Sequence, residues 1–179
     1  MNILRINSKN KYFSDVIALY QTAFPPDERR NVAEFERIAD TEPRFHINVF
    51  TDGDGAFLGF LTSWEWDDFR YGEHFAIDPA KRCGGIGGEA LRWFLGADSR
   101  PLVIEVEPPT DDMARRRIDF YKRNGLRPHA DVAYVQPPYD PSRNAIELKL
   151  MTYGDITIKD GDSYISRIHR DVYKSELMR

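Results

Sequence analysis

Alternating apolar and polar positions in the first part of the chain predict a meander of β-strands. The segment Phe45–Thr51 alternates strongly, and Ala56–Trp66 is a second apolar run of strand length. Between them lies Asp52–Gly55, whose Asp-Gly pairs are typical of a hairpin turn. A further run, Phe69–Asp78, and the short alternating stretch Ile3–Ile6 at the start bring the number of predicted strands in this part of the chain to four.

Helical spacing of apolar residues follows the first strand and recurs in the second half of the chain. The first predicted helix begins at Ser14 or Asp15 and is stopped by Pro25, and the second carries Val32, Phe35 and Ile38. In the second half, one helix leaves a glycine-rich segment and ends near Gly96, and another runs from Asp111 or Asp112 to Asn124. The last is predicted over Tyr164–Leu177. The remaining strands are predicted at Pro101–Glu107, Asp131–Gln136 and Ala145–Met151. Strands and helices therefore mix along the chain, as in an α/β (α+β) fold.

The most informative stretch is Phe75–Leu95, where a short strand runs through a glycine-rich turn into a helix. Its four glycines lie within residues 84–88, directly after the basic residues Lys81 and Arg82. Glycine backbone can approach a ligand closely, and the free N–H groups at a helix N-terminus attract phosphate oxygens. The stretch therefore predicts an anion-binding loop.

Two motifs resemble those of the GCN5-related N-acetyltransferase (GNAT) family. The segment 82–88 fits the family's pyrophosphate loop, which reads Arg or Gln, two residues, Gly, one residue, then Gly or Ala. The segment Phe120–Leu126 resembles a second recurring motif, an aromatic residue and Tyr followed after three residues by Gly and Phe or Leu. The motifs occur in the family's order, with the strand Pro101–Glu107 between them.

The resemblance implies a mixed, mostly antiparallel central sheet of about seven strands with flanking helices. In this fold the fourth and fifth strands splay apart, and the cofactor lies in the gap. The resemblance covers residues 1–152, which we expect to form the acetyltransferase domain. Residues 153–179 are expected to be a C-terminal extension, helical and packed on the same domain.

The resemblance also implies the cofactor contacts. Acetyl-CoA, as co-substrate, would bind the main chain of the fourth strand and the glycine-rich loop. The residues concerned are Phe75, Ala76, Ile77, Arg82, Cys83, Gly84, Gly85, Ile86, Gly87 and Gly88, together with Tyr121. The family's usual Asn after the fifth strand is missing here, so an Arg of the segment 115–117 is a candidate to contact the phosphates instead.

Acetyl transfer to an amine needs a base for the amine and a proton for the leaving thiolate, and no enzyme nucleophile. By its motif position, Tyr121 is the candidate general acid. Glu105 resembles the base of some protein N-terminal acetyltransferases, and Glu73 on the fourth strand is the next candidate. Glu107 shares a strand face with Glu105. His74 is expected to point away from Glu73 and to serve packing.

The acceptor is predicted only as a small-molecule or peptide amine. The two helices after the first strand would wall its site, so Arg29 and Arg30 are candidates to face an acidic part of it. Glu107 and Tyr139 are further candidates for acceptor binding. The acidic residues Glu73, Glu105 and Glu107 favour a cationic acceptor, whereas Arg29 and Arg30 favour an acceptor with an acidic group.

Composition narrows the classes of protein. A net charge of −4 argues against a general nucleic-acid binder, and a single cysteine excludes an internal disulfide and a cysteine-built metal site. No metal is expected. No export signal or membrane-spanning run is recognised, so we predict a cytoplasmic protein away from membranes, either monomer or homodimer.

Two other functions fit parts of the pattern. Gly85–Ala90 also matches the dinucleotide fingerprint Gly-x-Gly-x-x-Ala, with Glu105 near the place of a ribose-binding acid. Residues 78–83, however, separate its first glycine from the strand, which makes a dinucleotide-binding oxidoreductase the weaker hypothesis. The other alternative is a sensor module that binds acyl-CoA without turnover.

Overall fold

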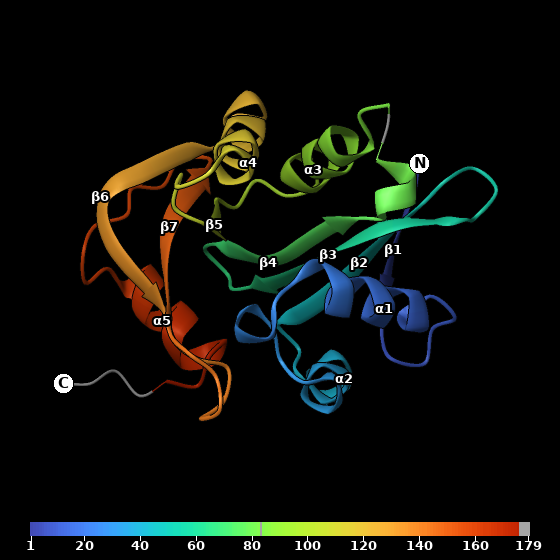
Figure 1. Cartoon of the computed structure of the whole chain (residues 1–179), viewed down its shortest axis with the longest axis horizontal. Helices are drawn as coiled ribbons and strands as arrows, with labels where there is room; N and C mark the ends of the chain where they lie inside the picture. Colours follow the sequence, from blue (N-terminus) through green and yellow to red (C-terminus); the bar gives the residue numbers. More distant parts are fainter. Residues whose placement is uncertain (83, 176–179) are drawn as a thin grey trace.

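The structure, a computed structural model that describes residues 1–82 and 84–175, is built on one seven-stranded sheet (Figure 1). The strands are β1 (Asn2–Ile6), β2 (Phe45–Thr51), β3 (Phe57–Glu65), β4 (Arg70–Ile77), β5 (Leu102–Val106), β6 (Arg127–Gln136) and β7 (Ile146–Tyr153). Their order across the sheet is β1-β2-β3-β4-β5-β7-β6, and β4 and β5 form the parallel pair in an otherwise antiparallel arrangement. The mixed, mostly antiparallel sheet predicted from the sequence is confirmed.

Helices cover both faces of this sheet. They are α1 (Phe13–Ala23), α2 (Val32–Thr41), α3 (Ile86–Gly96), α4 (Asp112–Arg123) and α5 (Ser163–Asp171), with short 3-10 turns at Pro26–Glu28 and Pro79–Lys81. Figure 1 shows α1 and α2 on one face and α3 and α4 on the other, with α5 beside the curved β6 and β7. Among the described residues, no helix is long and apolar enough to cross a membrane.

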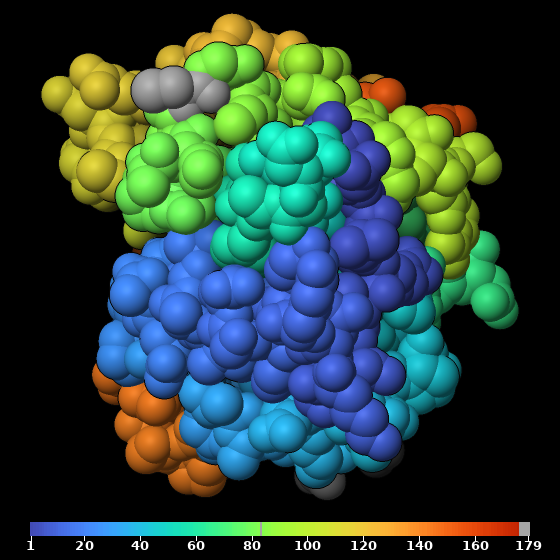
Figure 2. Space-filling view, turned by 90° about the vertical axis from the view of Figure 1, so that its right-hand side faces the viewer, coloured from blue at the N-terminus to red at the C-terminus, as the bar shows by residue number. Residues whose placement is uncertain are grey.

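The hydrophobic core is divided by the sheet into two parts. On one side, α1, α2 and α5 pack on apolar residues of the strands, and Ile165 and Ile168 bring α5 into the same cluster as Val16 of α1. On the other side, α3 contributes Leu91 and Phe94. Figure 2 shows the N-terminal segment, α1 and the turn after β2 filling the side of the molecule on the right of Figure 1.

The sheet opens between β4 and β5. The two strands pair over three positions, from Arg70 opposite Leu102 to Gly72 opposite Ile104, and pairing stops there although β4 continues to Ile77. Main-chain groups of β4 that face β5 beyond Gly72 are therefore left without a strand partner. This is the splayed pair expected for the fold.

Arg70 fastens α3 to the beginning of β4. Its side chain is buried, and its guanidinium donates hydrogen bonds to the carbonyl oxygens of Phe94 (2.8 Å), Asp98 (3.1 Å) and Arg100 (3.2 Å). The last carbonyls of a helix have no partners within it and carry partial negative charge. One cation therefore satisfies the C-terminal end of the helix that follows the glycine-rich loop.

Helix ends differ in places from the sequence prediction. The cap of α1 is Tyr12, which makes no side-chain capping bond, so the expected caps Ser14 and Asp15 lie inside the helix. Asp111 caps α4 as predicted, accepting a hydrogen bond from the Ala114 N–H.

The C-terminal helix is shorter than predicted and ends at Asp171. The chain turns at Lys174, whose φ of 52° interrupts helical geometry, and the Ser175 N–H bonds back to the His169 carbonyl. Residues 176 and 177 of the predicted helix lie outside the described part of the chain. Val172 and Tyr173, which lie between the helix and this turn, are both buried in the core.

Candidate active site

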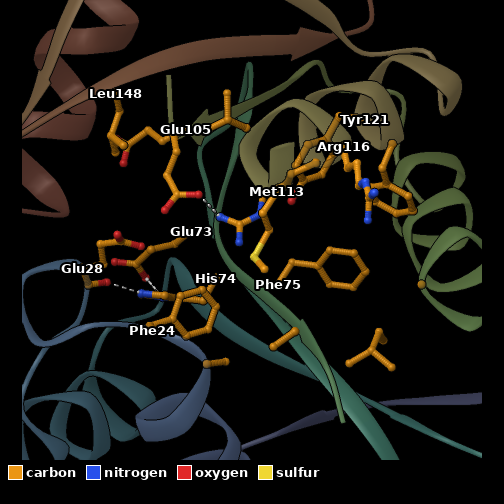
Figure 3. Close-up of a pocket in the computed structure, with 18 of the residues that line it drawn as sticks. Phe24, Glu28, Glu73, His74, Phe75, Glu105, Met113, Arg116, Tyr121 and Leu148 are labelled. Atoms are coloured by element: carbon orange, nitrogen blue, oxygen red, sulfur yellow. Dashed lines mark hydrogen bonds and ion pairs between the residues drawn. The ribbon is translucent and has the colours of Figure 1, made fainter. Parts of the chain in front are cut away.

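A cleft of about 810 Å³ lies where the sheet opens, and residues from both halves of the chain line it. One arm is lined by the second half of β4, the glycine-rich loop and α4. The other arm is lined by the segment after α1, by the acidic side chains of β4 and β5, and by Tyr139. Figure 3 shows Glu73, Glu105 and His74 on one side of the cleft and Arg116 and Tyr121 on the other.

The glycine-rich loop has the backbone geometry of an anion cradle. Gly84 and Gly85 both have left-handed backbone, with φ of 75° and 79°, and Gly85 is the N-cap of α3. L-residues with side chains rarely adopt this conformation, which explains why glycines stand here. Gly85, Ile86, Gly87 and Gly88 line the cleft, and the first N–H groups of a helix have no partner within it. Cys83, which is also predicted to contact the cofactor, lies outside the residues that the structure describes.

Phe75, Ala76 and Ile77 lie on β4 beyond its last pairing with β5, and all three line the cleft. Their other edge is held by β3, where Phe75 pairs with Leu61. The exposed residue Arg82 also lines the cleft, and its Nε donates to the Ile77 carbonyl at 3.2 Å. The structure thus gathers the described members of the predicted cofactor set along the cleft, except Gly84, which does not line it.

A β-bulge at Glu73 corrects one expectation. Thr62 pairs with His74 and Ser63 pairs with Gly72, so Glu73 has no partner on β3. The Glu73 Oε2 atom lies 3.6 Å from His74 Nδ1. The expectation that these side chains point to opposite faces is wrong, because strict alternation fails at a bulge. His74 is buried as a packing residue, with its ring against those of aromatic neighbours on α1.

The Glu73 carboxylate is enclosed by hydrogen-bond donors. It forms an ion pair with Arg30, and it accepts hydrogen bonds from Trp64 Nε1 at 3.1 Å and from the Tyr139 hydroxyl at 3.0 Å. Its side chain is 0% exposed. Burial is the largest single effect and acts to raise the pKa of Glu73, but the charges and hydrogen bonds of Arg30 and His74 together outweigh it, and the pKa falls to about 2. The carboxylate is ionised, and its oxygens are occupied by protein groups.

Glu105 has the opposite environment. Its oxygens accept hydrogen bonds from the hydroxyls of Tyr134 and Tyr173, which are uncharged donors. Burial raises the pKa of Glu105 to about 7, against the hydrogen bonds, which act to lower it. A general base works best when its pKa lies near the operating pH. The two carboxylates at this cleft thus have pKa values that are pushed apart in opposite directions. The raised pKa of Glu105 suits proton transfer, and the lowered pKa of Glu73 suits a fixed negative charge.

Tyr121 lies on α4 and lines the cofactor arm of the cleft. Its ring packs edge-on against that of Phe120, with centroids 5.3 Å apart. Burial raises the pKa of Tyr121 to about 12, and the charge of Arg117 acts weakly against this. The phenol therefore holds its proton at neutral pH, as a general acid must.

The candidates for acceptor binding are largely committed to protein partners. Arg29 Nε donates to the Phe24 carbonyl at 3.0 Å, and Arg30 is buried against Glu73. Tyr139 places its ring 4.5 Å from the Arg30 guanidinium carbon. A role for these residues in acceptor binding stays a prediction, and the structure gives each of them a structural contact.

Glu107 is more accessible to an acceptor. It pairs with Arg117 at 2.5 Å, and its side chain is 39% exposed. Glu28, which the sequence did not single out, lines the same arm, and burial together with the charge of Glu107 raises its pKa. Within residues 1–82 and 84–175, no three His, Asp or Glu side chains are grouped so that they could hold a metal ion.

Sequence reasoning missed the tyrosines around Glu105. Tyr134 is a buried position of β6, and its alternation with exposed neighbours gives no sign of its partner. Tyr173 follows an amphipathic helix outside the family-like region, and no motif marks it. Its contact with Glu105 joins positions 68 residues apart, which no local pattern reveals.

Fold and site together define a class: an acyl-CoA-dependent transferase, with a splayed parallel strand pair, a glycine-rich helix start and a carboxylate poised near neutral pH. No protein-family model matches the sequence, and no curated protein matches it. Among solved structures, a candidate acetyltransferase of the GNAT family from Bacteroides thetaiotaomicron is 33% identical, with a TM-score of 0.91, over 98% of this chain and 100% of that one.

Two more distant structures share the fold. A GNAT family acetyltransferase from Elizabethkingia anophelis, with acetyl-CoA bound, is 12% identical with a TM-score of 0.59 over 86% of this chain and 97% of that one. A spermidine N-acetyltransferase variant from Vibrio cholerae is 12% identical with a TM-score of 0.60 over 86% and 94%. The 33% match over the full length shows the family: this chain belongs to the GCN5-related N-acetyltransferases.

Proposed function

We propose that this protein transfers an acetyl or short acyl group from acetyl-CoA or a related thioester to the primary amine of a small molecule, by direct attack in a ternary complex. The observation that carries the proposal is the cleft. It joins a glycine-rich helix start at one arm to a carboxylate of near-neutral pKa at the other, with a protonated phenol on its wall.

The cofactor arm fits acetyl-CoA in three respects. The start of α3 and its left-handed glycines suit the pyrophosphate. Arg82 and Arg116 both line this arm, and their positive charges suit the phosphates. Beyond Gly72, the free main-chain groups of β4 suit the amide groups of the pantetheine chain. A backbone N–H on this stretch is also a donor to polarise the thioester carbonyl.

Glu105 takes the proton of the acceptor ammonium group in this proposal, directly or through water. Glu105 passes this proton to solvent, and the neutral amine nitrogen then forms the new C–N bond as the C–S bond breaks. The acylated nitrogen gives its second proton to Glu105, and Tyr121 gives its proton to the leaving sulfur. The proton on Glu105 passes to solvent, and Tyr121 is reprotonated from solvent. Glu73 is left out of proton transfer, because its ion pair with Arg30 keeps it ionised and enclosed.

A small-molecule amine is the proposed acceptor class. A structural neighbour is described as a spermidine N-acetyltransferase, and its acceptor is a small cationic amine. The acceptor arm here carries the carboxylates of Glu28, Glu105 and Glu107 beside apolar Phe24 and Leu148. Such a surface suits a cationic amine with an apolar portion. The cytoplasmic location and the monomeric or homodimeric state stay predictions.

Ligand binding tests the cofactor half of the proposal. We expect acetyl-CoA and CoA, but not NAD or ATP, to raise the Tm of the protein. At about a hundredfold the Kd, a ligand that binds only the folded state adds about 2.7 kcal/mol. Gly87→Asp should abolish the shift, because a carboxylate would enter the anion cradle.

Gly87→Ala is the matched control, since a Cβ at Gly87 would meet its nearest neighbour, Ile77 Cγ1, at an ordinary 3.6 Å. A folded Gly87→Asp variant that still responds to CoA would contradict the assignment of the loop, and a response to NAD would favour a dinucleotide enzyme. Turnover is tested by following CoA release with a panel of amines. Binding without turnover on any amine would favour a sensor module.

A further inference from the structure

The Glu105 carboxylate is held by tyrosines that come from different parts of the chain. Tyr134 of β6 donates to Oε1, and Tyr173, beyond the end of α5, donates to Oε2 at 2.8 Å. The Tyr173 hydroxyl also lies 2.8 Å from that of Tyr71 on β4. Both Glu105 oxygens are therefore oriented by protein donors, and each retains a lone pair for a further donor.

The hydrogen bonds around Tyr173 have a fixed direction. An ionised carboxylate only accepts hydrogen bonds, so the single hydroxyl proton of Tyr173 goes to Glu105. The Tyr173 oxygen is then the acceptor for Tyr71. Tyr71 on β4, Tyr173 in the C-terminal segment and Glu105 on β5 thus form a directed chain, in which each bond strengthens the next.

The segment that carries Tyr173 is anchored to the acceptor arm of the cleft. The carbonyl of the preceding residue, Val172, accepts a hydrogen bond from Arg30 Nη2 at 2.7 Å. The ring of Tyr173 packs against that of Tyr139, with centroids 4.9 Å apart. After Tyr173 the chain turns at Lys174, whose Nζ lies 2.9 Å from Glu34 on α2. The hydroxyl is therefore fixed from several sides.

We propose that Tyr173 is a positioning residue for acetyl transfer: it orients the Glu105 carboxylate through its hydroxyl, and the C-terminal segment thereby completes the active site. The inference rests on the proposed role of Glu105 as base. It adds that a residue beyond 1–152, the span of the sequence motifs' resemblance, takes part in the reaction, although Tyr173 itself does not line the cleft.

Removing one donor from Glu105 has a predictable sign. The hydrogen bonds from Tyr134 and Tyr173 stabilise the ionised carboxylate and lower its pKa, whereas burial raises it. The titratable and charged groups that face Glu105, or stand beside it, are Tyr71 and Glu73 on β4, Glu107 on β5, Tyr134 on β6, Tyr139 after β6, and Tyr173. Tyr173→Phe leaves all others in place, so the pKa of Glu105 should rise.

The experiment measures the pKa of Glu105 in two ways, by NMR in the protein without substrates and from the pH dependence of kcat/KM during turnover. Protein labelled with ¹³C at the Glu side-chain carboxyl is titrated by NMR, and Glu105→Gln assigns the signal. A hydrogen bond to a charged group corresponds to about one pH unit, so Tyr173→Phe should move the titration upward by about that much. In the active enzyme, the acid limb of kcat/KM should move by the same amount, with activity recovered at higher pH.

Tyr12→Phe is the matched control, because Tyr12 is also buried and its hydroxyl donates to the Gly55 carbonyl at 2.7 Å, away from the cleft. It should leave the Glu105 titration unchanged. Tyr71→Phe should give a smaller upward shift, since hydrogen bonding by Tyr71 lowers the pKa of Glu105 less than hydrogen bonding by Tyr173 does, and this variant serves if Tyr173→Phe does not fold.

The outcomes separate this inference from the proposed function. An unchanged Glu105 titration in folded Tyr173→Phe, or in Tyr71→Phe where that is the folded variant, would overturn the positioning role, even if the parent acetylates amines. A shifted titration with an unmoved kcat/KM profile would show that Glu105 is not the base, and it too would overturn the inference. A parent that does not bind acetyl-CoA would instead overturn the proposed function, whatever the titration shows.

Discussion

Replacing Glu105 by Gln should change how stability depends on pH, because this carboxyl group titrates differently in the folded and unfolded chains. Burial raises its pKa from 4.5 to about 7 in the folded protein. The folded state then binds a proton more tightly than the unfolded state. The stabilisation from this proton is fully present below pH 4.5 and is lost as the pH rises through about 7.

The magnitude follows from the two pKa values. A difference of one pKa unit corresponds to 1.36 kcal/mol, so the rise of Glu105 from 4.5 to about 7 is worth about 3 kcal/mol. Glu73 does not interfere, because its pKa is lowered to about 2 and it titrates below this range. The pKa of His169 is lowered by burial, but this histidine is present in both proteins and cancels in the comparison.

Urea unfolding at steps between about pH 5 and about pH 8 gives the free energy of unfolding of the parent and of Glu105→Gln. The advantage of the parent over the variant should shrink by about 2.5 kcal/mol across this range, with most of the change between about pH 5 and about pH 7. Two curves that run parallel would refute the assignment of a raised pKa to Glu105. If the stability advantage of the parent over Glu105→Gln grew with pH, the pKa of Glu105 would be lowered by folding and not raised.

Three further substitutions test other parts of the site. Tyr121→Phe should lower kcat by about a hundredfold or more while the Tm shift with CoA persists, and unchanged steady-state kinetics would exclude the phenol as general acid. Arg116→Glu should weaken CoA binding in calorimetry, most at low salt, and equal affinity would exclude a phosphate contact. Arg30→Met should lower the free energy of urea unfolding by about 3–5 kcal/mol, because it leaves Glu73 buried and unpaired. Adding Glu73→Gln should restore part of this loss, and a double variant no more stable than the single one would contradict the ion-pair explanation.

Local patterns predicted the scaffold well and the site only in part. Strand alternation and helix spacing predicted the seven strands, and the glycine-rich segment predicted where α3 begins. The bulge at Glu73 escaped prediction although Gly72 stands beside it, because its position depends on how β3 and β4 pair. The pairing of Arg30 with Glu73 escaped for a similar reason, since the two residues stand 43 positions apart.

The same limit explains why Glu73 and Glu105 looked alike in the sequence. Both are acidic residues on inner strands, and only their neighbours give them opposite chemistry. Those neighbours, Arg30 and Tyr173, come from segments outside the sheet. The chemical character of a buried carboxyl group is thus set by long-range packing, which a single sequence does not display.

The link between Arg70 and the far end of α3 bears on the entropy of ligand binding. Because the carbonyls of Phe94 and Leu95 in its last turn are bonded to the buried Arg70 side chain, the end of α3 is held in place without any ligand. An anion that binds at the N-terminus of α3 then loses little free energy to ordering the helix. Preorganisation of this kind raises affinity because the entropy cost of binding is smaller. In hydrogen–deuterium exchange, the second half of α3 should be slow in the free protein, and CoA should add protection only around the glycine-rich turn.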